Sequence, residues 1–267
     1  MVDERHLLRV AYVVSTGRTA TEFLAWFFSQ AFPDRVTALH QPAPYRLFRP
    51  LSNAHVSGHL GENALRLAFR LARGRRLRRI ATPIYLESNN YLYGFANLLA
   101  GTAPGTTPFH VVRHPFDFIR SQLNFGSSSG LKKLMADRLP FWSLKPEYFG
   151  EAPAWRDRPP EEQYAYAWVK TNAFLDRARA ADPRWRLLRF EDIFDAQSSG
   201  LEAMVEALGL IWRPEIHAGM ARQPKNASHG GGLPPWRNWD PALLARLRQV
   251  CGEAAAVYGY DLDAREG

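Results

Sequence analysis

A short polar segment with a single glycine, residues 15–21 (STGRTAT), separates two apolar runs near the start of the chain. If it joins a strand to a helix, the N–H groups of the turn and of the first helical residues point at one spot and favour negative charge there. Arg18 would add a planar, permanently charged donor that suits phosphate and sulfate. We therefore expect an anion-binding turn made of Thr16, Gly17, Arg18, Thr19, Ala20 and Thr21.

This turn differs from the loop that binds nucleoside triphosphates, G-x-x-x-x-G-K-[ST]. It has one glycine and no lysine, and only a threonine stands where a magnesium ligand would be. Polar turns with Gly and Thr also occur in α/β proteins that bind nothing there. The turn alone therefore leaves the ligand open.

A second segment, residues 111–121 (VVRHPFDFIRS), has the same strand-to-helix character. Arg113 ends an expected strand, and Pro115 opens a helix because proline suits the first helical position. Ser121 lies about two turns into that helix. Ligands of open parallel sheets bind outside the carboxyl ends of the strands. Two anion sites at two such ends predict a nucleotide with phosphates at both of its ribose positions.

Alternating strands and helices must position these two segments. We predict strands at 7–15, 36–41, 79–86, 109–113 and 185–190, and helices at 22–32, 60–73, 90–100, 115–123, 160–181, 201–208 and 241–258. Long loops are expected at 125–159 and 219–238. This alternation predicts a three-layer α/β fold in which a parallel sheet is flanked by helices. No repeat or change of composition divides the chain, so residues 1–267 are expected to form one domain.

Composition narrows the class of protein. The chain has 267 residues, 46% of them hydrophobic, which excludes disorder and fibrous folds. Its net charge is +8, and 29 of the 34 basic residues are arginine; either a polyanionic partner or a biased coding sequence would explain this. The lone Cys251 excludes an internal disulfide and a cysteine metal cluster. No apolar run approaches the ~18 residues of a membrane span, so we expect a cytoplasmic protein.

Taken together, these segments resemble the sulfotransferases that use 3′-phosphoadenosine 5′-phosphosulfate (PAPS), and within them the bacterial and carbohydrate branch. Residues 15–24 (STGRTATEFL) resemble the 5′-phosphosulfate loop of that family, and residues 111–121 resemble its 3′-phosphate motif. Three later similarities follow in the order of the family: Phe190-Glu191-Asp192, Trp236-Arg237, and Cys251-Gly252 with Gly259-Tyr260. The resemblance spans most of the chain and implies a P-loop NTPase-like architecture.

The resemblance also implies roles for these residues. A sulfuryl group would pass from PAPS to a hydroxyl or amine of a small molecule or carbohydrate, without a metal and without nucleic acid, leaving 3′,5′-ADP (PAP). Arg18 would stabilise the charge on the leaving phosphate, Arg113 and Ser121 would hold the 3′-phosphate, and Trp236 and Arg237 would contact the nucleotide. The chain departs from the family pattern at Ala20, Glu22 and His114.

An acceptor hydroxyl needs a base within hydrogen-bond distance. Two candidates stand at expected carboxyl ends of strands, namely His40, whose ordinary pKa suits a base near neutrality, and Glu87. His40 is otherwise a structural histidine at the edge of the sheet, and Glu87 is otherwise a helix cap or an ion-pair partner. Aromatic residues of the long loop, Trp142 and Trp155 among them, are candidates for an acceptor pocket.

Two other functions compete with sulfuryl transfer. One is a small-molecule kinase with a degenerate phosphate loop, against which the missing Gly-Lys-[Ser/Thr] argues. The other is a module that binds polyanions without catalysis, through the six arginines between residues 70 and 79, which are otherwise expected to be a solvated surface. Each alternative explains one feature, whereas the sulfotransferase hypothesis explains both motifs and their order.

Overall fold

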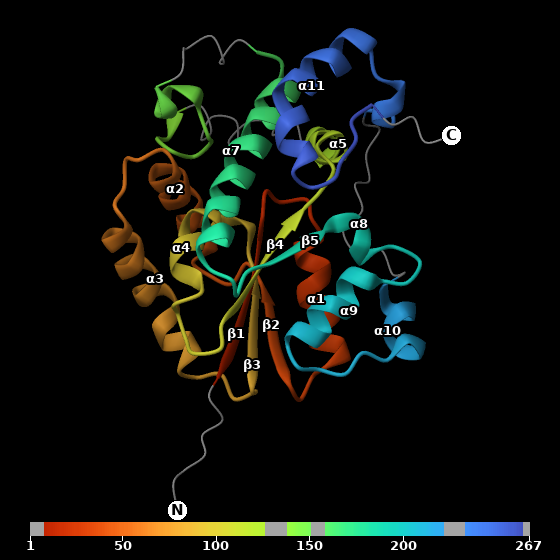
Figure 1. Ribbon diagram of the computed structural model, residues 1–267. Coiled ribbons are helices and arrows are strands. Elements are labelled where there is room, and N and C mark those ends of the chain that lie inside the picture. Colours follow the sequence, from red (N-terminus) through yellow and green to blue (C-terminus); the bar gives the residue numbers. More distant parts are fainter. Residues whose placement is uncertain (1–7, 126–137, 151–157, 222–232, 264–267) are drawn as a thin grey trace, which may run out of the picture.

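Five parallel strands form the centre of the molecule in the computed structural model, which describes residues 8–125, 138–150, 158–221 and 233–263. They are β1 (Arg9–Ser15), β2 (Val36–His40), β3 (Ile84–Ser88), β4 (Thr107–Val112) and β5 (Arg186–Arg189). Their order across the sheet is β2-β3-β1-β4-β5 (Figure 1). β1 therefore lies between β3 and β4, and the turn that follows it opens at the middle of the sheet.

Helices cover both faces of this sheet (Figure 1). One face carries α1 (Thr21–Ala31), α8 (Phe190–Ile193) and α9 (Ser199–Ala207), with α10 (Pro214–Ala221) outside them. The other face carries α2 (Tyr45–Val56), α3 (Glu62–Leu77), the 3₁₀ helix η1 (Asn90–Phe95), α4 (Ala96–Leu99) and part of α7 (Pro160–Ala181). The rest of α7 packs with α5 (Pro115–Phe125), η4 (Trp236–Asn238) and α11 (Pro241–Ala256), and η2 spans Pro146–Phe149. The expected three-layer α/β fold is confirmed.

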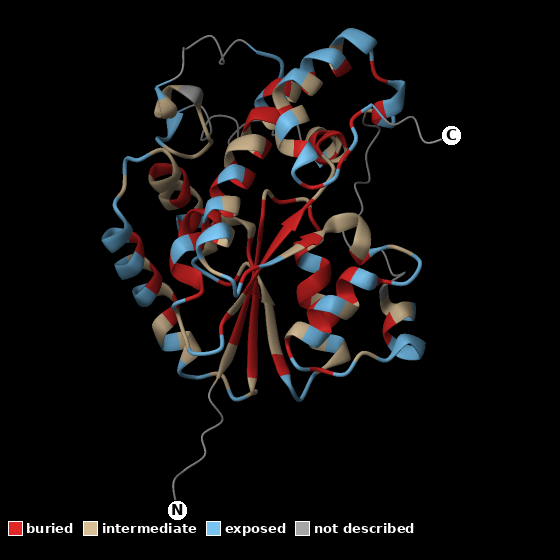
Figure 2. Ribbon diagram, in the orientation of Figure 1, coloured by how far each residue is buried: buried red, intermediate tan, exposed pale blue. Residues whose placement is uncertain are grey.

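The central strand shows why this sequence makes a buried parallel sheet. Val10, Tyr12 and Val14 face the cluster under α2, α3 and α7, whereas Ala11 and Val13 face the cluster under α1 and α9. All five are fully buried (Figure 2). A strand covered on both faces carries a continuous apolar run instead of an alternating one, and the sequence at 10–14 (VAYVV) is such a run.

Two sequence predictions were wrong in detail. The third strand begins at Ile84 instead of residue 79, because α3 continues through Gly74 to Leu77. Helix α2 was not predicted; Pro44 precedes its first residue, and Pro50 lies inside the helix. Among the described residues, no helix combines the length and apolar character that crossing a bilayer requires.

Candidate active site

The turn after β1 is tightly curled. Gly17, Arg18 and Ala20 have φ angles of 86°, 56° and 60°, in the left-handed region. The buried Ser15 Oγ holds the turn from inside by accepting hydrogen bonds from the Gly17 N–H (3.0 Å) and the Thr19 hydroxyl (2.6 Å). A concave row of backbone N–H groups in such a conformation binds anions. No side chain of the described residues caps α1, so its first N–H groups add to that capacity.

Ala20, which stands where the family pattern has glycine, keeps the left-handed conformation despite its methyl group. Ala20 packs against the apolar cluster between the sheet and α1. Gly17 has no such room, because a Cβ at this position would lie 3.0 Å from Nδ2 of Asn90. The turn thus accommodates a methyl at residue 20, whereas a methyl at residue 17 would be strained at φ 86° and would require Asn90 to shift.

The second predicted anion segment lies directly against this turn. Arg113, which follows β4, donates a hydrogen bond from Nη1 to the backbone carbonyl of Arg18 (2.8 Å). Ser121 of α5 accepts a hydrogen bond from Nε of Arg18 (3.0 Å). The guanidinium of Arg113 lies over the ring of Phe190 at 4.1 Å, and that of Arg18 lies over Phe125 at 4.2 Å. The structure therefore brings Arg18, Arg113 and Ser121 into one site.

Arg113 carries a charge that has no ion-pair partner among the described residues. Its side chain is largely buried, and this burial lowers the pKa of Arg113, as does the nearby positive charge of Arg18, while Asp117 and Glu191 act in the opposite direction. Among the described residues, no carboxylate forms an ion pair with Arg113, and its buried Nε has no hydrogen-bond partner. Because buried charges are normally paired, this guanidinium fits an anionic ligand.

Trp236 and Arg237 lie beside the same corner. The Trp236 ring stacks on His114 with centroids 5.1 Å apart and an interplanar angle of 14°, and the Arg237 guanidinium lies 4.6 Å above Trp236. Glu191 fixes His114 from the other side by accepting hydrogen bonds from the His114 N–H (3.0 Å) and the Tyr260 hydroxyl (2.7 Å). Two segments far apart in sequence thus meet at the carboxyl end of β4.

His40 lies at the carboxyl end of β2, close to the start of α1. Burial lowers the pKa of His40, and the carboxylate of Glu22 opposes this shift in part. The same carboxylate acts on Arg18, whose pKa is lowered mainly by burial. His40 therefore stands near the turn after β1, and burial favours its neutral imidazole, the form that accepts a proton.

Glu87, the other candidate base, is the partner of a buried ion pair, which was the structural alternative expected for it. Its fully buried carboxylate accepts hydrogen bonds from Nε and Nη2 of Arg73 (2.6 and 2.7 Å), from the Tyr85 hydroxyl (2.9 Å) and from the Asn89 amide (2.9 Å). Both oxygens are thus occupied. The arginines between residues 70 and 79 were expected to be solvated. Arg73 is an exception, because its side chain is fully buried.

Sequence reasoning placed Asn90 in a polar cluster that could bind the acceptor, but did not place it beside the turn after β1. Asn90 stands next to Gly17, and its Oδ1 accepts a hydrogen bond from the side-chain amide of Gln41 (2.6 Å). The polar run 87–90 (ESNN) after the third strand was the only available signal for this contact. The gap in the sequence between Gly17 and Asn90 hides their proximity, which results from the pairing of β1 with β3.

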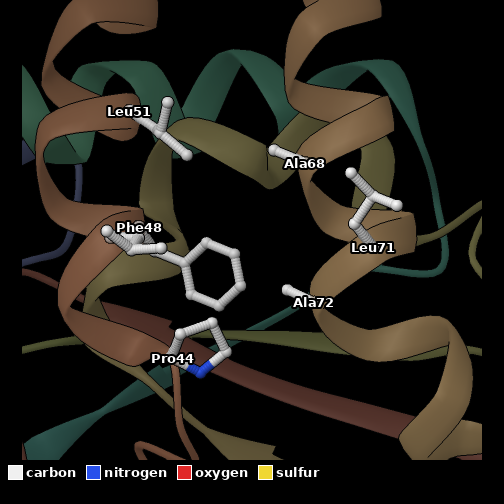
Figure 3. A pocket seen from close by; sticks show the side chains of 7 residues that line it. Pro44, Phe48, Leu51, Ala68, Leu71 and Ala72 are labelled. Atoms are coloured by element: carbon white, nitrogen blue, oxygen red, sulfur yellow. The ribbon is translucent and has the colours of Figure 1, made fainter.

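A separate pocket of about 350 Å³ lies between α2 and α3 (Figure 3). Its lining is entirely apolar: Pro44, Leu47, Phe48, Leu51, Ala68, Leu71 and Ala72. These side chains offer no group that binds an anion or moves a proton, so we do not place the reaction there. No cluster of His, Cys, Asp and Glu that suits a metal ion was found among the described residues.

Known structures share this architecture. A sulfotransferase domain from the curacin biosynthetic pathway matches with a TM-score of 0.53 and 13% identity over 96% of this chain and 99% of its own. A sulfotransferase domain from the Synechococcus PCC 7002 olefin synthase matches with a TM-score of 0.51 and 15% identity over 97% of both chains. No protein-family profile and no curated protein sequence matches the chain. The chain has the sulfotransferase fold.

Proposed function

We propose that this protein transfers a sulfuryl group from PAPS to a hydroxyl or amine of a small molecule or carbohydrate. The observation that carries the proposal is the contact between the two anion-binding corners, the Arg113 guanidinium on the carbonyl of Arg18, within a sulfotransferase fold. A donor with phosphate at both its 3′ and 5′ positions presents two anionic groups on one ribose. Neighbouring corners that both favour anions suit such a donor.

The residues divide the work between binding and proton transfer. Arg113 and Ser121 bind the 3′-phosphate, and the N–H groups of the turn with Arg18 bind the 5′ end. When the acceptor oxygen bonds to sulfur, the sulfur–oxygen bond to the 5′-phosphate breaks and leaves negative charge on that phosphate, where Arg18 stabilises it. His40 takes the proton of the acceptor hydroxyl. PAP and the sulfated acceptor are the products.

Nucleotide preference tests the donor site. We expect PAP at about 100 times its Kd to stabilise the fold by about 2.7 kcal/mol, which corresponds to a rise in Tm of roughly 5–10 °C; ATP with magnesium at equal concentration raises it far less. Arg113→Ala removes the preference. Arg186→Ala, which changes an exposed arginine at the opposite end of β5, is the control and keeps it. Equal shifts from both nucleotides would favour a kinase and refute the proposal.

Transfer itself is measured with isotopically labelled PAPS and a metabolite extract, in which labelled products identify the acceptor. His40→Ala is expected to abolish turnover and to retain the PAP-induced shift in Tm, because His40 acts on the acceptor side. An active His40 variant would show that another group takes the proton. Binding that depends only on salt concentration, with no competition from PAP, would instead support the polyanion-binding alternative.

A further inference from the structure

One face of α2 carries three polar or aromatic side chains that contact η1 and the segment around residue 141. Tyr45, Arg49 and Asn53 follow one another at four-residue spacing, so they share a face of the helix. The Arg49 guanidinium lies close to two aromatic rings, 5.6 Å from the centroid of Tyr91 and 5.7 Å from that of Trp142. Tyr45 adds a third ring to this aromatic cluster, because it stacks on Tyr91 with an interplanar angle of 7°.

Hydrogen bonds fix the parts of this cluster. Asn53 donates from its side-chain amide to the carbonyl of Phe141 (2.6 Å), which holds the segment that carries Trp142. The Tyr93 hydroxyl bonds to Oδ1 of the same Asn53. These hydrogen bonds hold the residues around Arg49 in place.

Arg49 itself is half-buried and forms no ion pair among the described residues. Within the described ranges, no carboxylate pairs with it and no carbonyl or hydroxyl accepts its N–H groups. Its neighbour Arg46 is exposed instead and lies over Tyr45. A partly desolvated guanidinium near aromatic rings can use its planar fork of N–H groups for bidentate recognition of carboxylates.

The cluster adjoins the point of sulfuryl transfer. Tyr91 directly follows Asn90, which stands against Gly17 of the donor turn and is hydrogen-bonded to Gln41, the residue after His40. An acceptor whose hydroxyl lies near His40 would thus extend over Asn90 toward the rings around Arg49.

We infer that Arg49, close to Tyr91 and Trp142, binds a carboxylate carried by the acceptor, so that the protein acts on hydroxylated carboxylic acids with a flat or ring-shaped body. This inference rests on the proposed function, because it assumes that the acceptor enters beside the donor turn. The stacked rings contact the body of the acceptor, and Arg49 contacts its acid group.

Matched pairs of probes test the inference on the PAP-bound protein. Each pair consists of an acid and its neutral amide: 4-hydroxybenzoate with 4-hydroxybenzamide, and glucuronate with glucuronamide. Calorimetry or ligand-observed NMR gives both dissociation constants. For at least one pair we expect the acid to bind about 10-fold more tightly or better, since one charge-assisted bidentate contact has this magnitude.

Variants assign the preference to Arg49. In Arg49→Gln the acid and the amide are expected to bind equally. Arg49→Lys keeps part of the preference for the acid, because it keeps the charge but loses the bidentate guanidinium. Arg46→Gln on the same helix keeps the whole preference. The PAP-induced rise in Tm must persist in every variant, which shows that each is folded and that the donor site is intact. A preference that survives in Arg49→Gln, or no binding of either acid to the wild-type protein, would overturn the inference.

The two proposals fail separately. If PAP does not stabilise the protein more than ATP does, the proposed function fails, whatever the acids do. If PAP is preferred but acids and amides bind alike, the donor site stands and the carboxylate-binding role of Arg49 falls.

Discussion

The buried ion pair between Arg73 and Glu87 allows a sharp prediction about stability. Both side chains are fully buried, and Arg73 also donates to the backbone carbonyls of Pro42 and Ala43, which follow β2. Arg73→Met leaves the Glu87 charge buried without its partner and removes both contacts to the chain after His40. Breaking one side of a buried pair costs about 3–5 kcal/mol. That is a large part of the roughly 5–15 kcal/mol of a typical domain.

Urea titration of the free energy of unfolding measures this loss, and a second arginine of α3 provides the control. Arg66 pairs with Glu62 at 2.6 Å, the same distance as in the buried pair, but the two side chains are 52% and 46% exposed. Exposed pairs contribute about 0–1 kcal/mol, so Arg66→Met is expected to change little. Adding Glu87→Gln to Arg73→Met removes the stranded charge and restores part of the stability. If Arg73→Met costs no more than Arg66→Met, the reasoning from burial is refuted.

Two predictions concern pH. The carboxylate of Glu22 raises the pKa of His40, in opposition to the larger effect of burial. Glu22→Gln is therefore expected to lower this pKa and to shift the acid limb of the kcat/KM profile to lower pH. An unchanged acid limb would exclude His40 as the base. Burial lowers the pKa of His110 to about 4 from 6.5. Below pH 6.5, His110 is therefore protonated in the unfolded chain but not in the folded one. The free energy of unfolding falls by about 1.4 kcal/mol per pH unit until pH 4, or about 3 kcal/mol in total. In urea titrations at pH 7 and 4.5, His110→Gln should lose less stability on acidification than the wild type; equal losses would contradict the assignment.

The fold was predictable because its three central strands, β1, β3 and β4, are almost entirely buried. Continuous apolar runs such as 10–14 and the proline at the start of α5 mark strands and corners within a few residues. Helix α2 was not predicted. A proline just before a helix, such as Pro44, is compatible with it because the first N–H groups of a helix have no intrahelical partner. The single domain and the cytoplasmic location remain predictions.

The candidate site was predictable only in part. Arg18, Arg113 and Ser121 stand in short motifs whose local sequence carries their chemistry, so their types and positions could be read directly. The roles of Arg73 and Glu87 could not, because the two residues are 14 positions apart and meet only after α3 packs on the sheet. The contact of Asn90 with the turn after β1 and the role of Arg49 were missed for the same reason, since their partners lie on other elements.

The hydrogen bond from Arg113 to the Arg18 carbonyl couples the geometry of two loops that are 95 residues apart. Inserting or deleting a residue in either loop would move the anchor of the other, so neither can drift in length independently over evolution. For the same reason, the turn after β1 would lose this hydrogen bond if it were grafted alone onto another protein. Engineering of the anion-binding site therefore has to redesign both loops together.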